Sequence, residues 1–259
     1  MREDAPGAEA LLQLCAFLAS DDIPRSLPRE QAALLPEELG HLVRDPLAYN
    51  NALGTLARYS LATVTPTVLG LHRLVQAVIR ARLKDREGQW AQIALELLEA
   101  AFPKDSWELA RWRTCQRLLP HVIAATGHAE RLEMAGQQEG RLLDRTSTYL
   151  LERGRYSDAK PLAERALAVT EQVLGPEHAE VCKRHDTLGR VLQELGDYQG
   201  AKQHYQQALE IGQATLGPDH PFVAVYRRNL DDVVQQTGGV WRRALQQLPL
   251  SRTGVVRGR

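Results

Sequence analysis

The stretch that decides the fold is GRYSDAKPLAERALAVTEQVLGPEH at residues 154–178, because it recurs as GDYQGAKQHYQQALEIGQATLGPDH at residues 196–220. Gly154 corresponds to Gly196, so the two copies are offset by 42 residues. A third, partial copy begins at Phe222. A fixed period of this length indicates stacked copies of one supersecondary unit.

Each copy has the pattern of two antiparallel helices. The first helix of the second copy has apolar residues at helical spacing, namely Val181, Leu188, Val191, Leu192 and Leu195. Gly196-Asp197 interrupts it, and a second helix is predicted from about Tyr198 to Leu216. Gly217-Pro218 ends that helix, because proline disfavours helical geometry in the residue before it.

This arrangement of small residues and tyrosines resembles the tetratricopeptide repeat, in the longer form found in kinesin light chains. In that form an extended second helix and an LGPxHP turn lengthen the unit to 42 residues. The resemblance covers residues 139–239. It implies an α-solenoid of helical hairpins whose first helices line a concave face that binds a protein, a peptide or another ligand.

If the chain follows this family, the inward-facing polar residues of the first helices contact the ligand. They combine both charge signs with amides, which suits a peptide backbone and its charged side chains. The alternative is that they only solvate an open groove. The candidates are Arg141, Asp144, Thr148, Lys183, Asp186, Arg190, Gln193, Arg228, Asp232 and Gln235.

The front of the chain begins with three predicted helices. Residues 8–20 have the pattern of an apolar helix, and Pro24 and Pro28 then mark a loop. A short helical region opens near Leu34, and Asp45-Pro46 starts a third helix that ends near Tyr59, because Asp caps helix N-termini and Pro is favoured at the first helical position.

A small β-hairpin and a further helix follow. Residues 61–71 alternate around the turn Thr65-Pro66-Thr67, which predicts two short strands. His72 then precedes an apolar helix that extends to about Lys84. Three helices, a hairpin and a helix are the order of a winged-helix domain, which we expect over residues 1–86.

A winged helix raises the alternative of a DNA-binding regulator. The helix before the hairpin, residues 46–58, would enter the groove, yet its only basic side chain is Arg58. Because DNA affinity depends on cationic contacts with phosphates, we expect no nucleic-acid binding.

The front half also resembles the winged-helix segment of NB-ARC-type STAND ATPases, which are signalling switches. The resemblance lies in LCAFLASDDIP (14–24), LARYSL (56–61), the hairpin and LHRLVQAVIR (71–80). In bacterial members this segment precedes linking helices and tetratricopeptide repeats. Linking helices are accordingly expected over residues 87–138, with Trp90, Trp107 and Trp112 packed at the junction.

In that family His72 would correspond to the histidine of an MHD-like motif, which contacts the phosphate of bound nucleotide. The neighbours here are Leu71 and Arg73, so the aspartate of the motif is absent. No G-x-x-x-x-G-K-[ST] loop is present to hold phosphates. We therefore expect no cofactor, since ADP or ATP would need a separate nucleotide-binding domain, and His72 would contact nucleotide only in a full-length parent.

No other motif points to an enzyme or a metal site. H-E-x-x-H, G-x-S-x-G and C-x-x-C are all absent. Cys15, Cys115 and Cys182 are widely spaced, which favours reduced, buried thiols over disulfides. We therefore expect a non-catalytic protein without metal.

Charge and hydropathy give no sign of a membrane or a polyanion as partner. Lysine plus arginine number 32 and aspartate plus glutamate number 32, so the formal net charge is zero. No apolar run approaches the roughly 18 residues of a membrane span, and no signal peptide opens the sequence. These features predict a cytoplasmic protein.

The sequence thus predicts a mainly α protein with four regions. They are a winged-helix domain (1–86), linking helices (87–138), tetratricopeptide repeats (139–239), and a capping helix with a basic disordered tail (240–259). The favoured function is the sensor of a STAND-type switch that relays ligand binding to an ATPase domain absent from this chain. The second hypothesis is an autonomous adaptor or scaffold.

Overall fold

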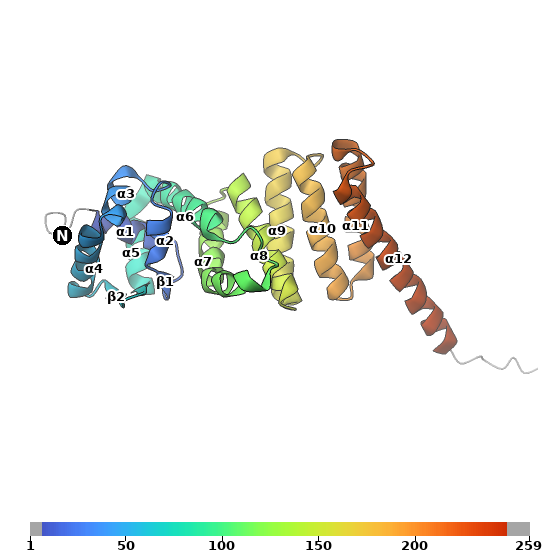
Figure 1. The fold of residues 1–259 in the computed structure, drawn as a ribbon, viewed down its shortest axis with the longest axis horizontal. Helices are drawn as coiled ribbons and strands as arrows, with labels where there is room; N and C mark the ends of the chain where they lie inside the picture. The colour runs from blue at the N-terminus through green and yellow to red at the C-terminus, as the bar shows by residue number, and fades with distance from the viewer. Residues whose placement is uncertain (1–6, 248–259) are drawn as a thin grey trace, which may run out of the picture.

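A computed structural model describes the backbone of residues 7–247 and the side chains of residues 7–237. The described part is mainly helical, with the N-terminal elements at one end, α6 and α7 in the middle, and α8 to α12 in series (Figure 1). No helix in this part is long and apolar enough to cross a membrane.

The N-terminal part combines five helices with a small antiparallel sheet. The elements in order are α1 (Ala8–Cys15), β1 (Ile23–Pro24), α2 (Ser26–Glu30), α3 (Glu37–Arg44), α4 (Pro46–Arg58), β2 (Ala62–Val64), β3 (Val68–Leu71) and α5 (Arg73–Leu83). The strand order is β1-β3-β2, so β3 lies in the centre. Leu69 pairs with Ile23 on one side and Val64 on the other.

Three local predictions for this part are confirmed. The Asp45 side chain caps α4 by accepting hydrogen bonds from the backbone N–H of Leu47 and Ala48, at 2.8 and 3.1 Å. The hairpin β2–β3 forms around the predicted turn. His72 lies at the N-cap of α5, where its Nδ1 accepts from the N–H of Leu74 at 3.2 Å.

Two predictions for residues 8–30 are wrong. The first helix ends at Cys15 instead of Ser20. The side chain of Gln76 donates to the backbone carbonyls of Cys15, its last residue, and Leu18, which lies beyond its end. The predicted loop at Pro24 and Pro28 contains β1 and α2. Two residues of strand are too short to show alternation, and Pro28 lies in the first turn of α2, where its missing N–H costs little.

The linking region contains the short 3₁₀ turns Lys84–Arg86 and Leu109–Arg111 and two long helices, α6 (Glu87–Ala101) and α7 (Trp112–Arg131). Trp90 is buried and the guanidinium of Arg153 stacks on the ring of Trp112, as expected at a junction. The prediction for Trp107 is wrong, because its side chain is 53% exposed in the loop after α6.

Five helices follow, as the repeat predicts. They are α8 (Gln137–Glu152), α9 (Tyr156–Leu174), α10 (Ala179–Glu194), α11 (Tyr198–Leu216) and α12 (Pro221–Gln247). Gly196 ends α10 with a φ of 82°, but the helix does not end at the corresponding Gly238 and α12 runs on to Gln247. The predicted capping helix is thus a continuation of α12, and residues 248–259 of the predicted tail lie outside the described residues.

Most buried apolar residues of the described part form one hydrophobic core, and Cys182, Ala208 and Tyr226 form a second, small cluster in the repeats. The main core extends from Ala8 in α1 through α6 and α7 to Val233 in α12. All three cysteines are free and buried, as predicted. The N-terminal part and the repeats therefore share a continuous packed interior.

Close packing of the repeat depends on small residues, of which Gly189 is the clearest case. A Cβ atom on Gly189 would lie 2.7 Å from Cε1 of Tyr205, which is buried in α11. We predict that Gly189→Ala lowers the free energy of unfolding by about 1–3 kcal/mol, because the tyrosine has to move. Urea denaturation followed by circular dichroism measures this.

Gly127 in α7 provides the matched control, since a Cβ atom there would meet nothing within 4 Å. Gly127→Ala should stabilise the protein by about 0.5–1 kcal/mol through helix propensity alone. Equal stabilisation by both substitutions would show that α10 and α11 are not in close contact at Gly189.

Candidate functional site

The first helices of the repeats, α8, α10 and α12, are joined side by side by polar contacts. Arg184 of α10 donates to Asp144 of α8 at 2.7 Å, and Asn229 of α12 donates to Asp186 of α10 at 2.8 Å. We call the surface formed by these polar residues of α8, α10 and α12 the first-helix face.

One cavity of about 300 Å³ opens where α8 and α10 begin. It includes three of the predicted ligand residues, Arg141, Asp144 and Lys183. Its lining comprises five cations and three carboxylates: Glu99, Lys104, Arg141, Asp144, Arg145, Glu180, Lys183 and Arg184. The positive charge here adds to the partial positive charge at the N-termini of both helices.

A second cavity of about 320 Å³ opens where α8 and α10 end. It brings together another three predicted residues, Arg190, Gln193 and Asp232. Its complete lining is Leu151, Glu152, Tyr156, Arg190, Gln193, Glu194, Tyr205, Asn229 and Asp232. Three carboxylates and one arginine make this end of the face acidic.

The other four predicted residues lie on the same helices but line neither cavity. Asp186 lies between α10 and α12 and is occupied by Asn229, and burial raises the pKa of its carboxyl while that hydrogen bond lowers it. Arg228 and Gln235 are exposed on α12, and Thr148 is half-buried on α8.

Arg184 holds the first cavity together, and sequence reasoning overlooked it. Its side chain is only 4% exposed, and its guanidinium binds Asp144 at 2.7 Å and Glu180 at 2.8 Å. Burial raises the pKa of the Asp144 carboxyl and the Arg184 charge opposes that rise. The sequence contained a signal, because Arg184 is three residues after Val181 and four before Leu188, which places it on the apolar stripe.

Glu99 of α6 is a second residue that the sequence did not reveal. Its carboxylate binds Arg145 and Arg141 of α8, the latter at 3.1 Å. Arg145 also donates to the backbone carbonyls of Glu99 and Phe102, each at 3.1 Å. A linking helix therefore forms part of the first-helix face, through a contact between segments distant in the sequence.

The charged and amide side chains of the two cavities can form ion pairs and hydrogen bonds with a ligand. The described residues contain no group of three or more His, Cys, Asp or Glu able to hold a metal ion.

The two cavities lie at opposite ends of α8. Arg141 and Glu152 are eleven residues apart on α8, so the two cavities are separated by about 16 Å at 1.5 Å per residue. That distance is about five residues of an extended peptide.

Comparisons with known proteins agree with this geometry. The family model for the tetratricopeptide repeat matches residues 147–211 and 182–248. A model for a domain of unknown function (DUF7779) matches residues 1–88. A search of the curated proteins found no match.

An array of helical hairpins with a 42-residue period defines the C-terminal part as an α-solenoid. The family match identifies its units as tetratricopeptide repeats. Repeats of this kind generally bind proteins or peptides, which makes this part a protein-interaction module.

A histidine pair lies between the helices of the second repeat. His185 Nδ1 and His204 Nδ1 are 2.9 Å apart, and Glu171 of α9 lies 3.7 Å from His185 Nε2. Burial and, to a smaller extent, the charge of His204 lower the pKa of His185 to about 4. Burial also lowers the pKa of His204, which Glu164 and Asp197 oppose.

We predict that this pair makes the repeats less stable in acid. A folded-state pKa of about 4 against an ordinary 6.5 means that the neutral His185 stabilises the fold above pH 6.5, and that this contribution is lost as the pH falls towards 4. The loss is at most about 3 kcal/mol. Urea denaturation at pH 7.5 and pH 5 should show a smaller pH effect in His185→Gln than in the wild type.

The exposed His41 of α3 supplies the control, so His41→Gln should retain the wild-type difference between the two pH values. If the free energy of unfolding changes equally between the two pH values in wild type and His185→Gln, the histidine pair does not cause the loss of stability in acid.

A second prediction concerns the buried arginine. Arg184→Met leaves the Asp144 carboxylate without its cation in a buried place, so the free energy of unfolding should fall by about 3–5 kcal/mol. Arg141→Met is the matched change at a side chain that is 40% exposed, and it should cost less than about 1 kcal/mol. If the two variants lose similar amounts of unfolding free energy, Arg184 is solvated and not buried.

Proposed function

We propose that this chain is the non-catalytic sensor and regulatory part of a STAND-type signalling switch. The first-helix face of the repeats binds a protein or peptide segment. The N-terminal part relays that binding to an ATPase domain that is present only in a full-length parent. Tetratricopeptide repeats behind a separate helical domain support this arrangement.

The observation that carries the proposal is the contact of Glu99 with Arg141 and Arg145. A ligand that binds Arg141 competes directly with Glu99 for its guanidinium. Because α6 packs on α1 and α2 through the continuous core, a shift of α6 reaches the N-terminal part. Binding therefore changes the relative free energies of two arrangements of the repeats and the N-terminal part.

The architecture of residues 7–83 supports a winged-helix assignment. Three helices precede the hairpin, if α2 and α3 are taken as one irregular unit, and β1 completes a three-stranded sheet. α4, which precedes the hairpin, carries Arg58 as its only basic residue. That charge is too small for extensive phosphate contacts, so a relay role is favoured over DNA binding.

In this proposal His72 contacts the nucleotide only in a full-length parent. Its side chain is exposed, and Nδ1 is used to cap α5, which leaves Nε2 as the atom that carries the proton in the neutral ring. All other contacts with ADP or ATP would come from the separate nucleotide-binding domain. A place among the signalling ATPases of this class would locate the protein in the cytoplasm.

The alternative is an autonomous adaptor in which the same face binds partners and no nucleotide is involved. The two cavities with opposite charge favour a ligand with acidic and basic groups about 16 Å apart under either hypothesis. The genomic region upstream of residue 1 distinguishes the two, because the switch hypothesis fails if it encodes no nucleotide-binding domain.

We predict that charge reversal at the second cavity abolishes partner binding without unfolding the protein. Arg190→Glu combined with Asp232→Lys changes two accessible side chains, and the Arg190–Glu152 pair is exposed enough for its loss to cost less than about 1 kcal/mol. Asp186 is unsuitable for this test because its hydrogen bond with Asn229 joins α10 to α12. Affinity capture with wild type and variant, quantified by mass spectrometry, provides the measurement.

Glu210→Lys on the exposed side of α11 serves as the matched charge change outside both cavities. Partners that are lost in the double variant and retained in Glu210→Lys bind at the first-helix face. If every captured partner persists in the double variant at wild-type abundance, the ligand site is elsewhere.

A further inference from the structure

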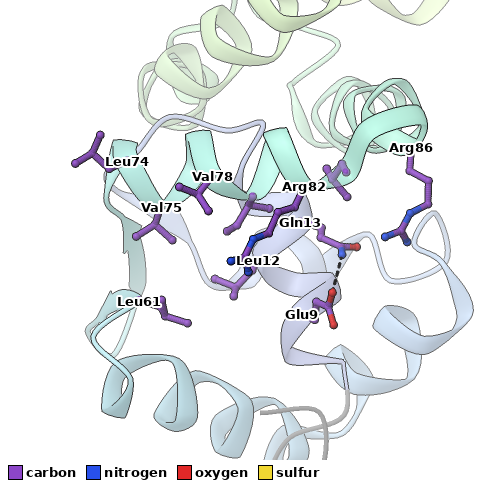
Figure 2. Close-up of a pocket in the computed structure, with 11 residues that line it drawn as sticks. Glu9, Leu12, Gln13, Leu61, Leu74, Val75, Val78, Arg82 and Arg86 are labelled. Carbon is purple, nitrogen blue, oxygen red and sulfur yellow. Dashed lines mark hydrogen bonds between the residues drawn. The ribbon is translucent and has the colours of Figure 1, made fainter.

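A large groove lies in the N-terminal part, away from the repeats. It has a volume of about 670 Å³ and lies between α5, α1 and the residue that precedes β2 (Figure 2). Its lining is mostly aliphatic: Glu9, Leu12, Gln13, Leu61, Leu74, Val75, Val78, Ile79, Arg82, Leu83 and Arg86. We call it the α5 groove.

One wall of this groove is an apolar stripe along α5 that no described element covers. The side chain of Leu74 is 70% exposed and that of Val78 is 52% exposed. Val75, which Figure 2 shows beside Val78, and Ile79 are half-buried and line the groove. Adjacent exposed aliphatic side chains that border a cavity are typical of a protein-interaction surface.

The opposite side of α5 fixes the helix in place, so the stripe is held rigidly towards solvent. Gln76 donates to the carbonyls of Cys15 and Leu18 at 2.9 and 3.0 Å, and Arg80 donates to the carbonyl of Ala16. These carbonyls belong to the end of α1 and the turn after it. A preformed, rigid groove binds with a smaller loss of conformational entropy than a mobile one.

Two arginines give the groove a positive charge. Arg82 and Arg86 line it at the C-terminal end of α5, and neither has an ion pair or hydrogen bond within the described part of the chain. Glu9 is the one acidic residue of the lining, and Gln13 donates to its carboxylate at 3.4 Å. In the repeats, by contrast, the arginines that line the cavities are paired with carboxylates of the same chain.

The dimensions fit a helix. Leu74 and Leu83 are nine residues apart, so the stripe is about 14 Å long, or between two and three helical turns. α1 forms the facing wall, and an amphipathic helix can bury its apolar side between two such walls. The α5 helix of a second copy is a poor occupant, because residues 73–83 contain no acidic residue to meet Arg82 and Arg86.

We propose that the α5 groove binds an amphipathic helix of a partner protein, whose apolar stripe covers Leu74 and Val78 and whose acidic end pairs with Arg82 and Arg86. This surface is separate from the first-helix face. The proposal therefore stands or falls independently of the ligand of the repeats.

Fluorescence anisotropy with two labelled synthetic peptides tests the proposal. Both peptides have about 16 residues, long enough for measurable helix content, and leucines at helical spacing. One has glutamates at one end and the other has lysines at the same positions. The full chain should bind the glutamate peptide at least about tenfold more tightly than the lysine peptide, which corresponds to two favourable charge pairs.

Two variants locate the binding. Val78→Glu places a charge on the apolar stripe and should weaken the glutamate peptide at least about tenfold. Arg82→Glu combined with Arg86→Glu should reverse the preference, so that the lysine peptide binds more tightly. Leu47→Glu is the matched control on α4, because Leu47 is 71% exposed and lies outside the groove lining, and it should change neither affinity by more than about twofold.

Three results would overturn the proposal. They are equal affinity for the two peptides, a loss in Leu47→Glu as large as that in Val78→Glu, and no binding by the full chain. If binding occurs only after residues 1–6 are deleted, the chain's own N-terminus occupies the groove and the partner-helix proposal is likewise wrong.

Discussion

The organisation of this protein depends on the ion pairs of one glutamate, Glu99 of α6, with Arg145 and Arg141 of α8. Arg145 is largely buried, and its guanidinium also satisfies two backbone carbonyls at the end of α6. Burial of the charge is unfavourable and lowers the pKa of Arg145. The carboxylate of Glu99 and the two carbonyls compensate that cost. The same contact places a residue of the linking region on the first-helix face.

Burial and pairing determine which cations of the repeats can meet a ligand. Arg184 neutralises Asp144 and Glu180 inside the array, so its role is to keep α8 and α10 in register. Lys183 and Arg190 are on the same helix but more exposed, and their ion pairs with Glu180 and Glu152 are partly solvated. The face therefore separates into a buried ion-pair layer that sets geometry and an outer layer that is free to exchange partners.

The sequence predicted what depends on local chemistry. The repeat gave the bounds of α11, Asp45-Pro46 gave the start of α4, and alternation around Pro66 gave the hairpin. It missed β1, which exists only because β3 pairs with it, and the pairing of Glu99 with Arg145, which joins residues 46 positions apart. It also predicted the burial of Trp107 from residue type alone, although burial depends on whether a neighbouring element covers the side chain.

α5 combines two features that the same helix geometry explains. At its start, Nδ1 of His72 satisfies the N–H of Leu74, one of the donors left unpaired at any helix N-terminus, so the histidine has a structural role without any ligand. Further along, Gln76 and Arg80 direct one side of the helix to the end of α1, and Leu74 and Val78 on the other side must then face outwards. The exposure of Leu74 and Val78 is thus a consequence of how α5 is fixed to α1. An apolar stripe fixed in this way towards solvent is costly to leave uncovered, which is the physical reason to expect a partner there.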